Sequence, residues 1–463
     1  MSTVQSDNAE SSSLSAYVAL SPPLPCVDAV RGPGFVHALG TDGLLIEFTL
    51  PAPLGEGELA VALSGHRTYA LPVSYAPNPT PSPEAVTLAA RVEPGPGRER
   101  LHDLLAVVRK SQHITICATM DVEASDRYTG LTDVSLVPMA LPNLAWDELD
   151  TRASFLGRTF PLPLLITGMT GGLARGAEIN LRLARAAAAF GIPMGVGSQR
   201  VALENPEHAA IFSVKKAVPE LFLIGNIGVT QLSRPDAVDL CRRAVDMIDA
   251  NALAIHVNVL QEVIQVEGDR DFRGLVDRIG AVAARLDVPV LVKEVGGGID
   301  PRTAAALVKA GVAAIDCGGR GGTSWSFIEG VRAQSPVTRA VADTFRDWGI
   351  PTAIATATLR RAHRELDLVA TGGIRDGLAV AKAVALGATM VGIGLPLLRA
   401  ALNSNDEPHQ VLETLARGLK TAMLCAGAPR LAVLAGRLHA TRPFREALAR
   451  WTEPAGPWDC PRD

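Results

Sequence analysis

Eight short, mainly apolar runs alternate with helical stretches between residues 163 and 393, and this alternation restricts the fold more than any other feature. Each run has four or five residues, as expected for a strand that is buried on both faces of a parallel sheet. The runs are 163–167, 193–196, 221–224, 252–256, 289–293, 313–316, 368–371 and 389–393. The helical stretches include 177–190, 235–249, 271–285, 302–310 and 378–386. Eight strand-then-helix units predict an α/β fold, a TIM (β/α)8 barrel, although a doubly wound sheet has the same alternation.

The chain has 463 residues, too many for one average domain, and its N-terminal part has a different pattern. Residues 1–15 are Ser-rich and charged, and we expect them to be disordered. Residues 16–100 predict a small β-rich extension that ends in a Pro/Gly linker. Its strand-like runs are 44–50, 58–63 and 68–74. The barrel is expected over 101–450, with a helical end at 408–449, and a polar tail follows at 451–463.

The charge balance gives no sign of a nucleic-acid or membrane partner. The chain has 44 Lys and Arg against 48 Asp and Glu residues, a formal net charge of −4. Phosphate binding would therefore depend on local clusters. The polar start lacks the apolar core of a signal peptide, and no apolar run reaches the length of a membrane span. The six cysteines show no metal-ligand spacing, which favours reduced thiols in a cytoplasmic protein.

Polar residues follow all eight predicted strands. In a TIM barrel, catalytic and binding residues lie where the strands end. One polar strand end has little meaning, because glycine and polar residues commonly end strands. Eight of them predict a shared ligand site at one end of the barrel.

Two glycine-rich loops follow the last two predicted strands. The first contains Gly372, Gly373 and Arg375, and the second contains Gly394. Glycine lets backbone N–H groups approach an anion, and the N-terminus of a following helix adds positive partial charge. These two loops frequently form a phosphate site in TIM barrels. The alternative is a pair of ordinary turns, but the glycine content of both loops favours the phosphate site.

Lys293 ends the fifth predicted strand. In a flavin site, a lysine at this place stabilises negative charge on the reduced ring. The alternative is a structural ion pair with Glu294. Ser198 and Asn226 follow the second and third strands and are candidates for hydrogen bonds to the polar rim of an isoalloxazine. Capping of the adjacent loops explains each of these two residues equally well.

The fourth strand carries the most informative local pattern. His256 and Asn258 alternate along it, so their side chains point the same way, and Gln261 and Glu262 follow in a predicted loop. Glu262 is a candidate ligand for Mg²⁺, which prefers oxygen donors and bridges to substrate phosphates. The alternative is a strand-end histidine with loop-capping neighbours, but the ring of polar strand ends favours a site.

A basic cluster precedes the predicted barrel. Arg109, Lys110 and His113 lie close together in the sequence. Three cationic side chains of this kind predict an anion clamp, because arginine can bind phosphate through two hydrogen bonds. Composition alone favours a solvated basic turn.

These motifs, in this order, resemble the type 2, FMN-dependent isopentenyl-diphosphate delta-isomerases over about residues 107–430. The motifs that carry the resemblance are Arg109-Lys-Ser-Gln-His113, Gly168-Met-Thr-Gly-Gly172, Gly195-Val-Gly-Ser-Gln-Arg200, His256-x-Asn-x-x-Gln-Glu262, Glu267-Gly-Asp-Arg-Asp-Phe272, Val292-Lys-Glu-Val295, Gly321-Gly-Thr-Ser-Trp325 and Gly372-Gly-Ile-Arg375. The last motif is weak by itself, whereas the ordered set is highly specific.

The resemblance implies an FMN-bound TIM barrel that interconverts isopentenyl and dimethylallyl diphosphate in isoprenoid biosynthesis. It also implies Mg²⁺, NAD(P)H to reduce the flavin, and a homo-oligomer, either a tetramer or an octamer. The implied catalytic residues are Gln261 and His256, and Glu262 is the implied metal ligand. The implied substrate ligands are Arg109, Lys110, His113, Asn258 and Gln261. The implied FMN ligands are Thr170, Ser198, Asn226, Lys293, Thr323, Gly373, Arg375 and Gly394.

Three residues depart from the family pattern. Val259 stands where proline is common, Pro138 where histidine is common, and Arg320 adds bulk and charge to a run that usually has small residues. The first hundred residues have no counterpart in the family. These departures keep two alternatives open, a barrel acting on another prenyl diphosphate and a non-catalytic binding module. An FMN-dependent hydroxy-acid oxidase is disfavoured, because the loop after the sixth strand lacks the His-Gly-Gly that this chemistry needs.

Overall fold

The computed structural model of the chain has two compact units. It describes the backbone of residues 18–28, 32–39, 43–48, 55–63, 67–77, 86–92, 96–169, 174–265, 268–333 and 335–452, and side chains from residue 108 onward except 174 and 175. One unit comprises Met1–His113, Leu260–Arg270 and Ser326–Phe345, and the other comprises Ile114–Val259, Asp271–Trp325 and Arg346–Asp463. The predicted disordered segment 1–15 lies outside the described residues, as does the polar tail from residue 453 onward.

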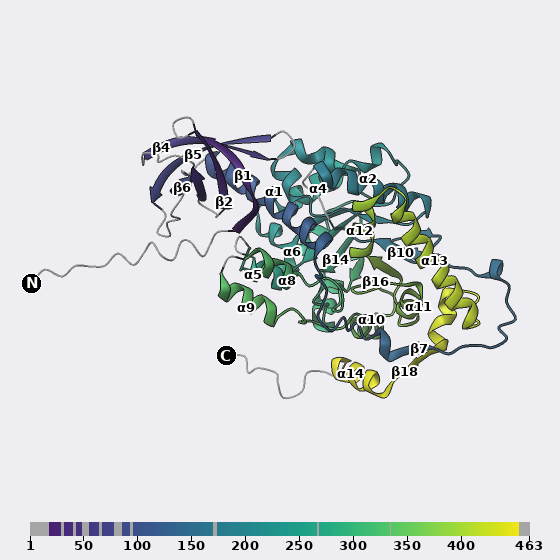
Figure 1. The fold of residues 1–463 in the computed structure, drawn as a ribbon. Helices are drawn as coiled ribbons and strands as arrows, with labels where there is room; N and C mark the ends of the chain where they lie inside the picture. Colours follow the sequence, from purple (N-terminus) through teal and green to yellow (C-terminus); the bar gives the residue numbers. More distant parts are fainter. Residues whose placement is uncertain are drawn as a thin grey trace, which may run out of the picture. The chain divides into compact units, whose positions relative to one another are not determined.

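Six antiparallel strands near the N-terminus close into a small barrel of their own (Figure 1). They are β1 (Val18–Asp28), β2 (Gly32–Leu39), β3 (Gly43–Phe48), β4 (Gly55–Leu63), β5 (Arg67–Pro77) and β6 (Val86–Val92). Their order around the barrel is β1-β2-β3-β6-β5-β4. The predicted β-rich extension is confirmed, and its predicted runs correspond to β3, β4 and β5. Strands β1, β2 and β6 were not predicted; β1 and β2 contain proline, which lowers strand propensity. Helix α1 (Pro96–Thr119) follows β6.

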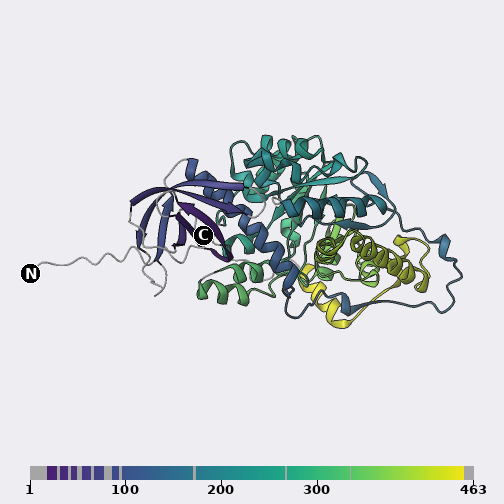
Figure 2. The same ribbon diagram turned by 45° about the horizontal axis from the view of Figure 1, so that its top comes forward.

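Eight parallel strands in the second unit form a closed barrel in sequential order, with β17 paired to β10 (Figures 1 and 2). They are β10 (Leu164–Ile166), β11 (Met194–Gly195), β12 (Leu223–Gly228), β13 (Ala252–Val257), β14 (Val290–Glu294), β15 (Ala314–Asp316), β16 (Asp367–Thr371) and β17 (Met390–Ile393). Each of the eight predicted runs contains or overlaps one of these strands. The TIM barrel is confirmed, and the closure between β17 and β10 excludes the doubly wound sheet.

Helices connect successive strands, and several pack directly on the barrel. The α-helices between α1 and the C-terminal region are α2 (Ala174–Ala189), α3 (Arg200–Glu204), α4 (Ala237–Ile248), α5 (Val259–Ile264), α6 (Leu275–Ala283), α7 (Pro301–Lys309), α8 (Trp325–Arg332), α9 (Pro336–Thr344), α10 (Thr352–Ala362), α11 (Gly377–Ala385) and α12 (Leu395–Asn403). Local sequence explains the start of α7: Asp300 accepts hydrogen bonds from the N–H groups of Arg302 and Thr303, and Pro301 is the first residue of the helix.

The C-terminal region differs from the prediction. A continuous helical end was expected over 408–449, but α13 (Glu407–Cys425) and α14 (Arg442–Thr452) are separated by the short strand β18 (Leu438–Ala440). Strand β18 pairs antiparallel with β7 (Val134–Leu136), far upstream in the sequence. The helical prediction was wrong for this stretch because a three-residue strand is stabilised by its partner and leaves almost no periodicity in the sequence.

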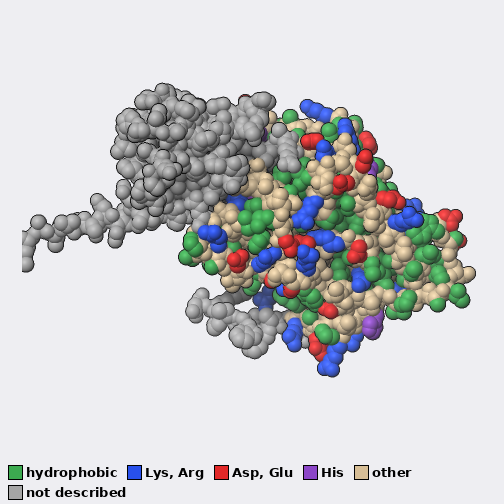
Figure 3. Space-filling view, viewed as in Figure 1, with side chains coloured by type: hydrophobic (Ala, Val, Ile, Leu, Met, Phe, Trp, Pro, Cys, Tyr) green, Lys and Arg blue, Asp and Glu red, His purple; other side chains and the backbone are tan. Residues whose placement is uncertain are grey.

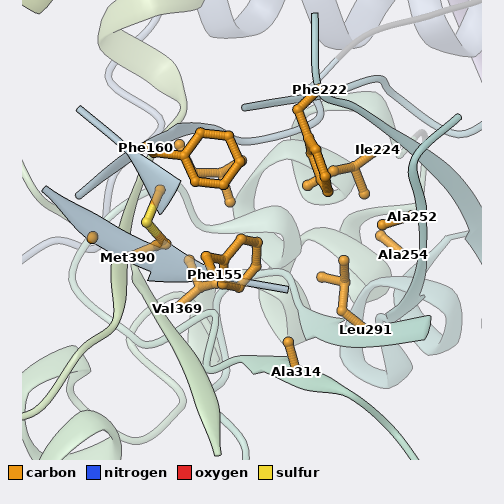
Figure 4. Close-up of a cluster of buried hydrophobic side chains, with 12 residues drawn as sticks. Phe155, Phe160, Phe222, Ile224, Ala252, Ala254, Leu291, Ala314, Val369 and Met390 are labelled. Atoms are coloured by element: carbon orange, nitrogen blue, oxygen red, sulfur yellow. The ribbon is translucent and has the colours of Figure 1, made fainter. Parts of the chain in front are cut away.

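A hairpin packs into the N-terminal end of the parallel barrel. It consists of β8 (Ala153–Phe155) and β9 (Arg158–Phe160), and both of its phenylalanines are buried (Figure 4). The barrel residues in the same cluster are Leu165, Phe222, Ile224, Ala252, Ala254, Leu291, Ala314, Val369 and Met390. Several of these are the first residues of their strands. The hairpin therefore fills one end of the barrel and leaves the carboxyl ends of the strands for a ligand.

The surface agrees with the balanced charge of the sequence. On the face shown in Figure 3, basic and acidic side chains are interspersed. No helix in the described part of the chain is long and apolar enough to cross a membrane.

Replacing Phe155 tests the role of the hairpin. Phe155 is completely buried, so Phe155→Ala removes a large side chain and leaves a cavity at the end of the barrel. We expect a loss of about 3–5 kcal/mol in the free energy of unfolding, measured by denaturant titration. The control is Leu141→Ala, because Leu141 is 88% exposed. Equal stability of the two variants would contradict the packing role.

Candidate active site

The predicted site residues lie in both compact units. Those in the unit that includes the N-terminal part of the chain are Arg109, Lys110, His113, Gln261 and Glu262. Those in the barrel unit are Ser198, Asn226, His256, Asn258, Lys293, Thr323, Gly373, Arg375 and Gly394. Thr170 lies outside the described residues.

The basic cluster is part of helix α1. Arg109, Lys110 and His113 fall within little more than one helical turn, and each is partly buried. Arg109 and His113 are four residues apart and therefore lie on the same face of the helix. The cluster is part of a regular helix, and its partial burial distinguishes it from the solvated basic turn that composition alone favoured.

A buried carboxylate, Glu329 on α8, connects two of the predicted residues. His113 Nε2 lies 2.9 Å from Glu329 Oε1, and Gln261 Nε2 donates to the same oxygen at 2.8 Å. The second oxygen, Oε2, accepts a hydrogen bond from Arg332, whose Nε donates to Gln112 Oε1 at 3.1 Å. The Glu329 side chain is fully inaccessible to solvent and that of Arg332 nearly so. This network therefore brings an amide and an imidazole together around one charged pair.

The electrostatics of the network fix its protonation. Burial opposes the charge on Glu329, but Arg332 and His113 outweigh that effect and hold its pKa well below the usual range. Burial lowers the pKa of His113, against the attraction of Glu329, which raises it. The carboxylate can only accept, so His113 presents an Nε2–H to it and Gln261 presents its NH₂ group.

Sequence reasoning missed Glu329 and Arg332. They are spaced i, i+3 within the helix that follows the Gly321-Gly-Thr-Ser-Trp325 loop, among mainly apolar residues. An acidic and a basic residue at this spacing in an otherwise apolar helix is the signal that indicates a buried pair.

Gln261 and Glu262 lie on the short helix α5. The predicted loop after the fourth strand was wrong here, because a helix of six residues is too short to leave a helical period in the sequence. Glu262 is partly buried, and its Oε2 accepts a hydrogen bond from the N–H of Asp269 at 3.0 Å. In the described part of the chain, no group of three or more His, Cys, Asp or Glu side chains is placed to hold a metal.

In the barrel unit, Asn226 on β12 determines how His256 is presented. The Asn226 amide donates from Nδ2 to the carbonyl of Val196 at 2.9 Å, which leaves its Oδ1 to accept from His256 Nδ1 at 2.8 Å. The proton of a neutral His256 is therefore on Nδ1. The other ring nitrogen lies beside Gly228, where a Cβ would come within 3.2 Å of it. Ser198 lies in the loop after β11, and Asn258, which is buried, directly follows β13.

Lys293 is buried at the end of β14, and its Nζ donates to the backbone carbonyl of Glu294 at 3.1 Å. The Glu294 carboxylate accepts from the N–H groups of Gly296 at 2.5 Å, Gly298 at 3.2 Å and Gly297. The alternative of a side-chain ion pair between Lys293 and Glu294 is therefore not what the structure shows. Burial raises the pKa of Glu294 to about 7, although these backbone donors act in the opposite direction.

The glycine-rich loops after β15 and β16 are in close backbone contact. A Cβ on Gly322 would lie 2.5 Å from the backbone nitrogen of Gly373, and Gly373 has a φ of +67°. Side chains at either position are therefore excluded, and the side chain of Thr129 also borders this surface. Gly394, in the next loop, begins helix α12 (Leu395–Asn403). This surface fits the phosphate ester of FMN, which backbone N–H groups and helix N-termini bind well.

Two arginines near these loops are already paired. Arg375 donates from Nη2 to Glu123 and from Nη1 to the carbonyl of Ile374 at 2.8 Å. Arg320, one of the family departures, donates to Asp126 Oδ2 at 2.5 Å and stacks over the ring of Tyr128, with its Cζ 5.6 Å from the ring centroid. The extra charge of Arg320 is thus balanced by a neighbouring loop. Sequence reasoning did not find Glu123, which is distant from Arg375 in the chain.

The raised pKa of Glu294 predicts a pH-dependent stability. Its folded pKa of about 7 exceeds the ordinary value of 4.5, so the folded protein keeps a proton that the unfolded chain releases between these values. Stability from this group is complete below pH 4.5 and is lost as the pH rises through 7. Relative to Glu294→Gln, the wild type should lose about 2–3 kcal/mol between pH 4.5 and 8, seen as a falling difference in thermal midpoint. If the difference in thermal midpoint between the wild type and Glu294→Gln stayed constant with pH, Glu294 would have an ordinary pKa and the prediction would be wrong.

Comparison with known proteins shows close relatives. Residues 256–441 match the family model of FMN-dependent dehydrogenases. The isopentenyl-diphosphate delta-isomerase of Nostoc sp. is 44% identical over 319 residues, which are 69% of this chain and 91% of that protein. The enzyme of the same name from Synechococcus sp. is 46% identical, over 68% of this chain and 91% of that protein. The one from Stutzerimonas stutzeri is 45% identical, over 71% and 95%.

Solved structures agree on the fold. Two structures of mandelate oxidase variants match with a TM-score of 0.51 and 23% identity, covering 73% of this chain and 99% and 98% of theirs. At this identity the likeness shows the barrel fold alone. The three isomerases, in contrast, are aligned over at least 91% of their own length at 44% identity or more. The chain therefore belongs to the family of type 2, FMN-dependent isopentenyl-diphosphate delta-isomerases.

Proposed function

We propose that this chain interconverts isopentenyl diphosphate and dimethylallyl diphosphate, as an FMN-dependent isomerase of isoprenoid biosynthesis. The relatives that match almost their whole length bear the name of this activity. Within the structure, the observation that supports it best is the Glu329 network. It holds the amide of Gln261 and the imidazole of His113 in fixed orientations around a buried charge. Side chains that are already oriented in this way can position a reactive substrate.

The reaction moves a double bond, so one proton must be added to an alkene and another removed nearby. An alkene is a weak base, and such a transfer needs a site from which water is excluded. Bound reduced FMN supplies the acid–base pair and an electron-rich ring that stabilises positive charge. Gln261 orients the reacting end of the substrate, because Glu329 restricts which end of its amide faces the buried carboxylate. His256, fixed through Asn226, contributes a second oriented polar group.

The remaining residues bind the cofactor and the substrate. Lys293 stabilises negative charge on the reduced ring, and Ser198, Asn226 and Thr323 contact the flavin. Gly373, Arg375 and Gly394 bind its phosphate, and Thr170 completes the set. Arg109, Lys110 and His113 bind the diphosphate, assisted by Asn258. Glu262 would hold Mg²⁺, since this ion prefers oxygen donors and is commonly bound by one or two carboxylates in phosphate-binding sites.

We also propose a reductant for the flavin, an assembly state and a cellular location for the enzyme. NAD(P)H reduces the flavin without net turnover of redox equivalents, and the enzyme is a homo-oligomer, a tetramer or octamer. A cytoplasmic location agrees with the buried, reduced thiols of Cys241 and Cys317. Residues 16–100 form an accessory β-rich domain, and residues 101–450 form the catalytic barrel. A non-catalytic flavin-binding module is the remaining alternative.

Gln261→Ala tests the activity directly. We expect anaerobic turnover of isopentenyl diphosphate with FMN, NADPH and Mg²⁺ to fall roughly 100-fold or more, because the substrate loses an oriented contact. The variant should remain yellow, since its flavin residues are intact. Val263→Ala, on the exposed side of the same helix, is the matched control and should keep full activity. Wild-type protein that binds flavin without turnover would support the binding module, and an active Gln261→Ala variant would remove its assigned role.

Glu262→Gln tests the metal site. The substitution keeps an oxygen that accepts from Asp269 but removes the negative charge that Mg²⁺ requires. We expect the Mg²⁺ concentration for half-maximal activity to rise by about tenfold or more, the equivalent of about 1.4 kcal/mol. Asp269→Asn removes an exposed acidic group from the same segment and is the control. An identical Mg²⁺ dependence in all three proteins would exclude Glu262 as the ligand.

A further inference from the structure

Residues 121–129, which we call the strap, lie along the loop after β15. The N–H of Ala124 donates to the carbonyl of Gly322 at 2.8 Å, and the N–H of Ser324 donates to the carbonyl of Val122 at 2.8 Å. Glu123 forms an antiparallel bridge with Thr323 between these two bonds. The strap is therefore attached by backbone pairing to the glycine-rich loop that the flavin phosphate is proposed to contact.

The strap brings a carboxylate to Arg375. Glu123 Oε1 accepts from Arg375 Nη2, and the Glu123 side chain is only 12% exposed against 34% for that of Arg375. Arg375 is in the same loop as Gly372 and Gly373, and its Nη1 is occupied by the carbonyl of Ile374. One arm of the guanidinium thus contacts its own backbone and another contacts an acidic side chain.

We propose that Glu123 is an internal counter-anion of the cofactor site, which satisfies Arg375 in the flavin-free protein and weakens binding of the FMN phosphate. This inference rests on the proposed binding of FMN. A partly buried guanidinium needs an anionic partner, and a carboxylate meets that need when no phosphate is present. When the phosphate binds, two anions share one cation, and their repulsion lowers the affinity. Glu123 therefore affects only ligands that carry the phosphate.

The fold of the strap does not depend on this carboxylate. Arg346 donates to the backbone carbonyl of Glu123 at 3.1 and 3.0 Å and to that of Asp121 at 3.0 Å. Together with the backbone bonds to the β15 loop, these contacts hold the strap in place. The neutral and isosteric Glu123→Gln therefore removes charge while leaving the segment attached.

A nearby acidic residue provides a matched control. Asp121 also lies on the strap, but its carboxylate pairs with Arg127 at 2.9 Å and is 61% exposed. Arg127 also approaches Glu123, with its Nε 3.7 Å from Oε2, but the Arg127 side chain is 60% exposed and its charge is screened. Asp121→Asn thus changes the charge of the strap by the same amount without removing the partner of Arg375.

The test compares dissociation constants of FMN and riboflavin for the full chain stripped of flavin, measured by quenching of flavin fluorescence. Glu123→Gln should bind FMN roughly threefold to tenfold more tightly than the wild type, as expected for a partly exposed ion pair. Its affinity for riboflavin, which has no phosphate, should be unchanged. Asp121→Asn should match the wild type for both ligands.

A second variant connects the effect to Arg375. In an Arg375→Gln background, adding Glu123→Gln should no longer change the FMN affinity beyond the effect of Asp121→Asn. Unchanged or weaker FMN binding by Glu123→Gln, in a protein whose wild type prefers FMN to riboflavin, would overturn the inference about Glu123 alone. A wild type that binds FMN no better than riboflavin would overturn the proposed phosphate site, and this inference with it.

Discussion

Hydrogen bonding between β17 and β10 closes the parallel barrel, and the position of every proposed flavin residue depends on this closure. The register pairs Leu164 with Val391 and Ile166 with Ile393, so the last strand returns to the first. Because all eight strands run in one direction, their carboxyl ends meet at a single rim. The hairpin around Phe155 fills the opposite end. The fold thus separates a packed end that supplies stability from an open end at which loops are free to carry chemistry.

Charges near the proposed site are compensated by specific partners. Glu329 is ionised because Arg332 and His113 offset the cost of burial, whereas Glu294 relies on three backbone N–H groups and titrates near neutrality. An arginine is a stronger compensating partner than peptide dipoles, and this difference explains the opposite shifts of the two carboxyl groups. The charge of Arg375 is likewise compensated by one specific partner, the carboxylate of Glu123.

The part of the site that could be predicted from sequence is the part that follows strand periodicity. Ser198, Asn226 and Lys293 could be proposed because each follows or ends a short apolar run, and the run itself marks the barrel. The helix carrying Gln261 was predicted as a loop, since six residues are too few to show a helical period. Glu329 and Glu123 were not found, because neither ends a strand. Their partners are 216 and 252 residues away in the chain.

The sequence alone determined the barrel, the β-rich extension and the family, because these depend on local alternation and on motifs whose residues are neighbours in the chain. Only the tertiary structure decided which charges compensate one another, how His256 and Gln261 are oriented, and that Arg320 and Arg375 already have acidic partners. The reason is physical: a pattern of burial repeats along the chain and can be read from it. A hydrogen bond or ion pair between distant segments depends on distances of a few ångströms that only the packed fold sets.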